Sequence, residues 1–285
     1  MDYYDKVQKT IDFIELHLTE DLSPNIIAEQ TFFSMTHFYR IFRGLVGESV
    51  KEYIRKRRLS QSAIELLAGE KRIIEIAMEY GFESQETYSR AFTKQFGITP
   101  GRYRRDKDVI VLYEKANIDQ YLNKKRANLS SLSVHTKVVY KKEFQVMGLQ
   151  AMVLPGPGMI TELWTAFNER WPEIECLSLS EDRLGICEYY PDITDENEFS
   201  YIACTEVVPS KQIPSGMISR RIPSSKYAVF SHQDSIQHLK DTYQFIYGVW
   251  LPESGYELAE LDTIEYYEFK AGHSDCELGI YIPIK

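Results

Sequence analysis

The sequence has no long uninterrupted run of apolar residues, and no stretch approaches the roughly 18 residues that a membrane-spanning helix needs. It also lacks a basic and then apolar leader, because residues 1–5 are acidic and polar. We therefore predict neither a membrane span nor a secretory signal, and we expect a cytoplasmic protein.

Cysteine and histidine are scarce and scattered. The four cysteines show no CxxC spacing, and in a chain without an export signal we expect them to be reduced, packed thiols. The six histidines form no metal-ligand spacing, and no Ser/His/Asp order stands out. We therefore predict no metal site, no cofactor and no catalytic activity.

Basic charge is outweighed by acidic charge, which gives a net charge of −9, but the balance is uneven along the chain. Residues 1–107 hold 17 Lys and Arg against 16 Asp and Glu, whereas residues 108–285 hold 16 against 26. In the first part the basic residues cluster at 51–58 and 102–107. Because salt screens charges beyond about 8–10 Å, such local clusters can bind DNA on an acidic protein. We expect DNA contact in the first part only.

Helical periodicity dominates the first hundred residues, with apolar residues at helical spacing over 7–18 and a typical helix start at Ser23-Pro24. Further helices are predicted over 35–43, 49–67 and within 73–97.

The stretch 76–97 predicts a helix-turn-helix, because Gly81 and Ser84 separate a short helix from a second one. The second helix would present amide, carboxylate, hydroxyl and guanidinium groups outward. These residues are Gln85, Glu86, Thr87 and Arg90. Such groups read base edges in a major groove.

An internal repeat of 50 positions relates this stretch to an earlier one. The equivalent pairs are Arg40 and Arg90, Phe42 and Phe92, Gly47 and Gly97, and Tyr53 and Tyr103. The outward residues of the earlier unit are predicted to be Thr36, Tyr39, Arg40 and Arg43. One such hairpin alone could be part of a plain helical bundle, but two in register favour DNA reading. Because successive major-groove faces lie about 34 Å apart, one chain could read both.

Residues 32–47 and, more specifically, 81–100 followed by Tyr103-Arg104 resemble the AraC/XylS family of transcription regulators. The resemblance covers 5–107 and implies a seven-helix, bilobed domain that docks both reading helices in neighbouring grooves of promoter DNA. It assigns base reading to the outward residues of both units. Tyr39 and Glu86 depart from the residues usual in the family, so the target sequence does not transfer.

Three arginines beside the reading helices complete the predicted DNA contacts: Arg55, Arg58 and Arg104. We interpret them as phosphate anchors or as parts of solvated faces, because positioning contacts outnumber base-reading contacts.

A connecting helix over 108–122 and a polar, serine-rich linker are expected next, with the domain boundary near 123–135. The predicted domains are therefore 1–107, which binds DNA, a connection over 108–135, and a second domain over 136–285.

The second domain is predicted to be α+β, with two related β-α-β-β units about a pseudo-two-fold axis. Both predicted helices, 161–174 and 236–249, end near a tryptophan followed by proline. The predicted strands are 137–154 with a bulge or bend at Gly148, 184–190, 200–208, 217–222, 227–232, 257–260, 263–269 and 277–284.

Residues 222–232, 250–256 and 280–284 resemble the GyrI-like small-molecule-binding domain, over about 137–285. The resemblance implies an aromatic groove around an acidic centre, and Rob-like regulators also place an AraC-type reader before such a domain. Aromatic faces with one carboxylate suit lipophilic cations. Glu265 is the expected acid, with Glu206 and Glu277 as rivals, although acidic strand residues otherwise face solvent.

The aromatic residues predicted to line this groove each have a place in the hydrophobic core as their alternative. They are Tyr140, Trp164, Trp171, Tyr201, Tyr227, Trp250, Tyr267 and Tyr281.

The whole chain is thus predicted to be a multidomain, ligand-responsive transcription regulator: an all-α double helix-turn-helix domain followed by an α+β GyrI-like domain. Its expected partners are double-stranded promoter DNA, RNA polymerase and a small-molecule effector, and it is expected to be a monomer or weak dimer. The resemblance favours activation over repression. Two alternatives stay open, since the second domain could bind a protein partner or hydrolyse its ligand.

Overall fold

The computed structural model describes residues 3–30, 33–122, 135–154, 157–178, 182–190, 198–210, 212–232, 238–268 and 277–285. The chain folds as two compact units, Met1–Lys125 and Arg126–Lys285, each with its own hydrophobic core.

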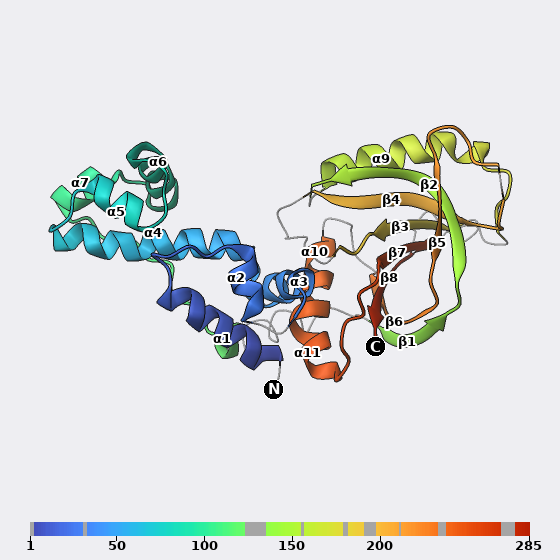
Figure 1. The fold of residues 1–285 in the computed structure, drawn as a ribbon, viewed down its shortest axis with the longest axis horizontal. Helices are drawn as coiled ribbons and strands as arrows, with labels where there is room; N and C mark the ends of the chain where they lie inside the picture. The colour runs from blue at the N-terminus through green and yellow to red at the C-terminus, as the bar shows by residue number, and fades with distance from the viewer. Residues whose placement is uncertain are drawn as a thin grey trace. The chain divides into compact units, whose positions relative to one another are not determined.

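The first unit is helical (Figure 1). Its helices are α1 (Tyr3–Leu16), α2 (Pro24–Glu29), α3 (Met35–Val46), α4 (Val50–Ala68), α5 (Ile73–Glu79), α6 (Gln85–Phe96) and α7 (Pro100–Asp106). Ser34, Ser49, Ser84 and Thr99 each cap a helix by accepting the backbone N–H three residues further on. Among the described helices, none is long and apolar enough to cross a bilayer.

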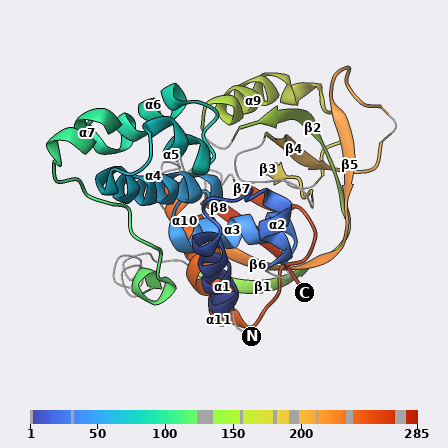
Figure 2. The same cartoon turned by 60° about the vertical axis from the view of Figure 1, so that its left-hand side comes forward.

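The predicted repeat forms two helix-turn-helix lobes (Figures 1 and 2). We call α1–α3 the first lobe and α5–α7 the second lobe, and α4 joins them. Each lobe contributes to an equivalent buried ring pair: the centroids of Phe42 and of Tyr53, which lies at the start of α4, are 5.7 Å apart, and those of Phe92 and Tyr103 are also 5.7 Å apart. Two local sequences with the same buried pattern have therefore folded in the same way.

The connecting helix predicted over 108–122 is wrong, because only residues 118–122 are helical. Residues 108–117 form neither helix nor strand, and alternate side chains face opposite ways: Ile110 and Leu112 pack on the second lobe's core, whereas Val109 and Val111 are 100% and 90% exposed. The period of two, with β-branched residues, fits extended backbone better than helix. The Tyr113 N–H donates to Ser60 Oγ at 2.9 Å, which holds this segment against α4.

The second unit is one eight-stranded antiparallel sheet with helices. Its strands are β1 (Thr136–Lys141), β2 (Phe144–Val153), β3 (Arg183–Cys187), β4 (Phe199–Val207), β5 (Ile218–Ile222), β6 (Ser225–His232), β7 (Thr263–Glu268) and β8 (Glu277–Ile284). Its helices are α9 (Pro157–Arg170), the 3₁₀ turn η1 (Trp171–Glu173), α10 (Leu239–Phe245), the π-helix η3 (Ile246–Trp250) and α11 (Leu251–Ser254).

The strand order β1-β6-β8-β7-β3-β4-β2-β5 confirms the two predicted β-α-β-β units. One unit is β2-α9-β3-β4 and the other is β6, the α10–α11 region, β7 and β8, and they meet where β7 pairs with β3. Three details differ from the prediction. Residues 137–154, predicted as a single strand, form the two strands β1 and β2. Gly148 pairs regularly, and it is needed because a Cβ there would lie 2.0 Å from the Ala203 carbonyl oxygen. Residues 257–260 form only one isolated bridge, from Leu258 to Ile284.

The two faces of the sheet bury different clusters. One face holds an apolar core that includes Leu184, Ile202 and Ile264. The other face is covered by α9, whose Phe167 packs with Ala203. Because neighbouring strand residues point to opposite faces, Glu265 lies on the opposite face from Ile264.

Candidate functional sites

The outward face of α6 carries the second predicted set of base-reading groups. Gln85, Glu86 and Arg90 are exposed, and with Ser89 they line a surface hollow of about 360 Å³. Thr87 is half-buried, because its N–H donates to the Ser84 cap at 3.1 Å and the two hydroxyls lie 3.0 Å apart. The face can therefore offer amide, carboxylate and guanidinium groups to a base edge.

Buried aromatic residues hold α6 in place from below. Tyr88 and Phe92 are fully buried, and the Tyr88 hydroxyl hydrogen-bonds Ser62 of α4 at 3.0 Å. Burial raises the pKa of the Tyr88 phenol to about 12. The orientation of Arg90 toward solvent therefore follows from side chains on the opposite face of the same helix.

The first predicted reading set is less exposed than the sequence pattern predicts. Arg40 and Arg43 are half-buried on α3, but Thr36 and Tyr39, predicted to face outward, are 2% and 4% exposed. Tyr39 lines the same cavity as Ile27 of α2, and its ring lies edge-on to Phe38. A tyrosine has enough apolar surface to be recruited into a core, whereas the smaller polar residue expected there would not be. Thr36, one turn earlier, shares that helix face.

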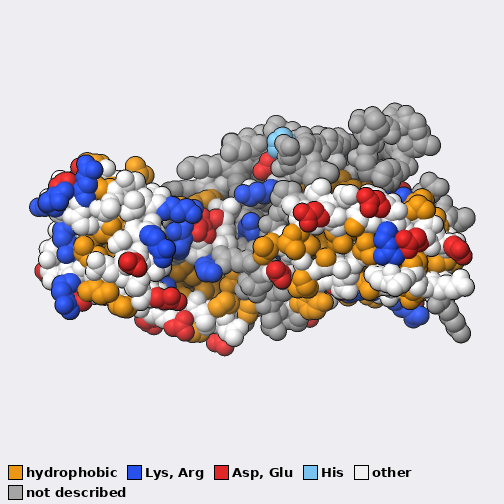
Figure 3. Space-filling model, turned by 90° about the horizontal axis from the view of Figure 1, so that it is seen from above, with side chains coloured by type: hydrophobic (Ala, Val, Ile, Leu, Met, Phe, Trp, Pro, Cys, Tyr) orange, Lys and Arg blue, Asp and Glu red, His pale blue; other side chains and the backbone are white. Residues whose placement is uncertain are grey.

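The three predicted anchoring arginines have intramolecular partners. Arg55 donates twice to Glu52, at 3.0 and 2.6 Å. Arg104 donates to the Leu66 carbonyl in the last turn of α4 at 3.1 Å, and Arg58 donates to the Leu18 and Glu20 carbonyls in the turn after α1. Arg104 therefore satisfies a helix C-terminus and Arg58 holds a turn, roles that the charge pattern did not reveal. Figure 3 shows Lys and Arg side chains gathered over parts of the first unit.

The neighbouring Arg57 is buried and structural. It donates to both carboxylate oxygens of Glu15, at 2.8 and 2.7 Å, and also to the Tyr113 carbonyl. The Tyr53 hydroxyl donates to the same carboxylate at 2.8 Å and accepts the Ala116 N–H at 3.2 Å. This network joins α1, α4 and the extended segment after α7.

The centre of the second candidate site is the carboxylate of Glu265, which is 6% exposed. It accepts three phenol hydrogen bonds, from Tyr201 at 2.7 Å, Tyr243 at 2.8 Å and Tyr267 at 3.1 Å. Burial is the largest cause that raises the pKa of all three phenols, and the Glu265 charge adds to it. The phenols therefore stay neutral donors at neutral pH, and Glu265 is the carboxylate that all three of them share.

Strand pairing brings this cluster together. Gly185 of β3 lies between Glu265 of β7 and Ala203 of β4. A Cβ at Gly185 would lie 1.9 Å from the Tyr201 hydroxyl and 3.1 Å from Glu265 Oε2. The missing side chain therefore makes the space in which the Tyr201 hydroxyl reaches the carboxylate.

Helices cover the carboxylate with aromatic groups. Trp164 of α9 donates its indole N–H to the Tyr201 hydroxyl at 3.2 Å, and its ring lies 5.0 Å from that of Tyr267 in an edge-on contact. Tyr243 of α10 stacks on Tyr247 of the following π-helix, with centroids 6.2 Å apart. The sequence analysis missed Tyr243. A signal was available, because Tyr243 lies in a predicted helix, one turn from one aromatic residue and two turns from another.

Several predicted ligand contacts lie on the other face of the sheet. Glu206 accepts from Tyr266 at 3.3 Å and forms an ion pair with Lys141 at 3.7 Å. Tyr227 and Tyr281 pack together, with centroids 6.0 Å apart, against the apolar core of that face. Because strand residues alternate between the two faces, Glu206, Tyr227 and Tyr281 lie on the opposite face from Glu265. The prediction that these three residues share a groove with Glu265 is therefore wrong.

The remaining predicted aromatic residues have other partners. Tyr140 lies on the edge strand β1 and is 69% exposed. Trp171 packs under the Arg183 guanidinium, whose Cζ lies 3.8 Å from the centroid of the Trp171 ring. Trp250 lies edge-on to Phe230, with ring centroids 4.9 Å apart. None of these contacts involves Glu265.

Two further predictions concern ligands and metals. Glu277 begins β8, and its side chain lies outside the described residues. Within the described ranges, His, Cys, Asp and Glu form no cluster of three or more that could hold a metal ion.

Comparison with known proteins agrees with this architecture. Residues 135–285, more than half of the chain, match the GyrI-like small molecule binding domain, and residues 27–106 match a Helix-turn-helix domain. The chain is similar to the HTH-type transcriptional regulator YbfP of Bacillus subtilis, 52% identical over 103 residues, which are 36% of this chain and 35% of YbfP.

Two further relatives match the same helical part. Transcriptional regulator Rob of Salmonella typhimurium is 39% identical over 108 residues, 38% of this chain and 37% of Rob. Regulatory protein SoxS of Salmonella typhimurium is 36% identical over 104 residues, 36% of this chain and 97% of SoxS. The similarity thus spans only about a third of YbfP and of Rob. With its N-terminal AraC-type helix-turn-helix region, the chain belongs to the family of the GyrI-like small molecule binding domain.

Proposed function

We propose that this protein is a ligand-responsive transcription regulator whose first unit reads promoter DNA and whose second unit binds a lipophilic cation at Glu265. The observation that carries the ligand proposal is a buried carboxylate without a cation. Among the described residues, Glu265 forms no ion pair, and its hydrogen bonds come from neutral phenols. A buried charge that lacks a counter-charge is costly, so a cation that arrives there relieves the cost.

The surroundings of Glu265 favour a delocalised, apolar cation over a hydrated one. The rings of Trp164 and Tyr267 offer aromatic faces or edges beside the carboxylate, and aromatic faces attract cations. The phenol donors already occupy the carboxylate oxygens, so the ligand needs no N–H donors of its own. We therefore expect a quaternary ammonium or phosphonium, and no chemical turnover of it.

DNA reading is assigned chiefly to α6, with Arg90, Gln85 and Glu86 as base-contacting residues. Arg40 and Arg43 of α3 are the proposed contacts of the first lobe, and Arg55 is a phosphate anchor. Because both lobes belong to one chain, a monomer can occupy two successive major grooves. Bound near a promoter, the regulator would act on RNA polymerase as an activator.

The test begins with genome-wide mapping of bound sites, which supplies a specific duplex. Arg40→Ala and Arg90→Ala should each weaken binding to that duplex by about tenfold to a hundredfold, since one good base contact is worth about 1–3 kcal/mol. Arg72→Ala is the matched control, because Arg72 is an exposed cation of the second lobe paired with Glu75. If both reading variants bind as the control does, α3 and α6 are not the readers.

A further inference from the structure

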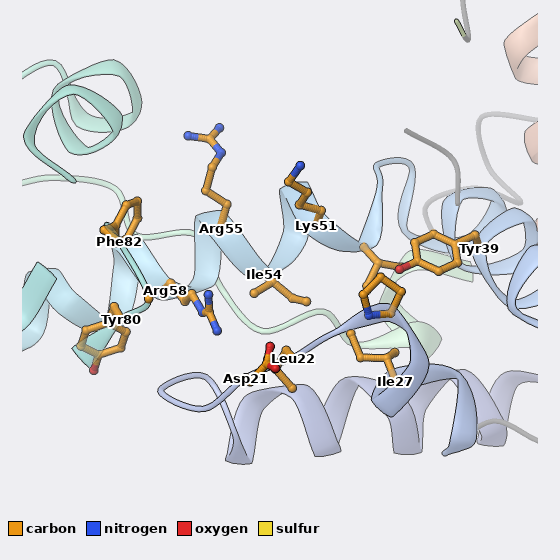
Figure 4. Close-up of a pocket in the computed structure, with 13 residues that line it drawn as sticks. Asp21, Leu22, Ile27, Tyr39, Lys51, Ile54, Arg55, Arg58, Tyr80 and Phe82 are labelled. Carbon is orange, nitrogen blue, oxygen red and sulfur yellow. The ribbon is translucent and has the colours of Figure 1, made fainter. Parts of the chain in front are cut away.

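A cavity of about 330 Å³ lies between the two lobes of the first unit (Figure 4). Its lining comes from α4 and from both lobes: Ile27 and Tyr39 belong to the first lobe, and Tyr80, Gly81 and Phe82 to the turn of the second. We call it the inter-lobe cavity. It lies in the other unit from Glu265, so it is a separate site.

The floor of the inter-lobe cavity is apolar. Ile54 of α4 points into it, and Leu22 and Ile27 lie opposite (Figure 4). The volume falls at the lower end of the roughly 300–1,000 Å³ typical of small-molecule sites, which are mostly apolar with a few polar groups. An aliphatic or aromatic body of modest size therefore fits the floor.

The charge around the cavity is positive. Lys51, Arg55 and Arg58 line it, against the single acid Asp21. Arg55 has a carboxylate partner, because it donates two hydrogen bonds to Glu52, and Lys51 is exposed to solvent. Arg58 is therefore the half-buried cation of this lining whose hydrogen bonds do not bring a negative charge.

Arg58 is held at the cavity wall without a carboxylate partner. Its Nε donates to the Leu18 carbonyl and its Nη2 to the Glu20 carbonyl, both at 2.7 Å. Within the described part of the chain it has no ion pair, and burial lowers the pKa of its guanidinium, which Asp21 only partly offsets. Its Nη1 faces Gly81, where a Cβ would approach to 2.6 Å. The absence of a Cβ at Gly81 therefore lets the guanidinium lie against this turn, from where Arg58 lines the cavity.

We propose that the inter-lobe cavity binds an amphipathic organic anion of the medium-chain carboxylate type. The carboxylate pairs with Arg58, and the apolar body covers Ile27 and Ile54. Because a charged hydrogen bond at a desolvated cation is stronger than one in water, the anion supplies the counter-charge that Arg58 lacks. A ligand here contacts both lobes and α4, so it also holds the spacing of the reading helices α3 and α6.

The test is calorimetric titration of the full chain, without DNA, using octanoate as the probe. Octylammonium and octanol have the same tail with the opposite charge or none, and they should bind at least tenfold more weakly. Arg58→Gln should weaken octanoate about tenfold, whereas Lys115→Gln, a partly exposed cation paired with Asp12, should leave it unchanged. Ile54→Phe keeps every charge but fills the floor, so it should also weaken octanoate if Arg58→Gln fails to fold.

Three results would overturn the proposal. The first is equal binding of octylammonium and octanoate, which would show that the tail alone is recognised. The second is unchanged octanoate binding in both Arg58→Gln and Ile54→Phe, which would place the ligand elsewhere. The third is that inorganic phosphate binds as tightly as octanoate and Ile54→Phe has no effect, which would make the cavity a plain anion or DNA-phosphate anchor. Because DNA is absent from every arm, these results are independent of promoter reading.

Discussion

Replacing Glu265 by glutamine removes one charge from the second unit while keeping nearly the same shape. At an effective dielectric constant of about 20, a monovalent cation about 5 Å from a carboxylate gains about 3 kcal/mol. Since each 1.4 kcal/mol is a factor of ten in affinity, Glu265→Gln should weaken a lipophilic cation about a hundredfold. The fold should persist, because the glutamine amide oxygen can still accept hydrogen bonds from the phenols. Their hydroxyl oxygens lie 2.7 to 3.1 Å from the Glu265 carboxylate oxygens.

The assay for this prediction is calorimetric titration with tetraphenylphosphonium and with tetraphenylborate. The two ions share a shape and differ in sign, so their difference reports charge alone. The wild-type protein should bind only the phosphonium tightly, and Glu265→Gln should bring the two affinities closer. Glu206→Gln is the matched control, because Glu206 lies on the other face of the sheet and pairs with Lys141. Equal phosphonium affinity in the wild type and Glu265→Gln, or a loss seen with Glu206→Gln alone, would refute the reasoning.

Three further predictions concern packing and pH. Gly185→Ala should displace the Tyr201 hydroxyl, because the added Cβ would lie 1.9 Å from it, so phosphonium affinity should fall while the DNA affinity measured by anisotropy stays unchanged. Arg57→Met leaves the carboxylate of Glu15 buried without its cation and should cost about 3–5 kcal/mol. Urea titration should show that loss in the helical circular dichroism signal, whereas tryptophan fluorescence, which comes only from the second unit, should keep its midpoint. Burial raises the pKa of Tyr88 to about 12 in the folded protein, against an ordinary value of 10.0, so its stabilisation is complete below pH 10 and falls by about 3 kcal/mol as pH rises toward 12. In Tyr88→Phe the fall of the urea midpoint over this pH range should be smaller by that amount, and a remainder should persist because burial also raises the pKa of other phenols in the unit, such as Tyr80.

Much of the first unit could be predicted because its information is local. Helix caps, apolar stripes at helical spacing and the fifty-residue repeat each depend on residues a few positions apart. Ser84 and Gly97 therefore bound α6 in the structure as the pattern predicts. The non-helical segment at 108–117 was not predicted, because its conformation is set by packing of Ile110 and Leu112 on a lobe formed earlier in the chain.

The sequence alone determined that two helix-turn-helix lobes precede an α+β domain of two similar units, since periodicity and repeats are properties of neighbouring residues. Only the tertiary structure decided which residues meet. Glu206 and Glu265 both lie on alternating strands, and strand register alone put Glu265 with Tyr201, 64 positions away, and Glu206 on the opposite face. Tyr39 is likewise buried, with its ring edge-on to that of Phe38, although the helical pattern placed it outward. Pairing between distant strands and the filling of a core are decided by the whole chain at once, so no local pattern specifies them.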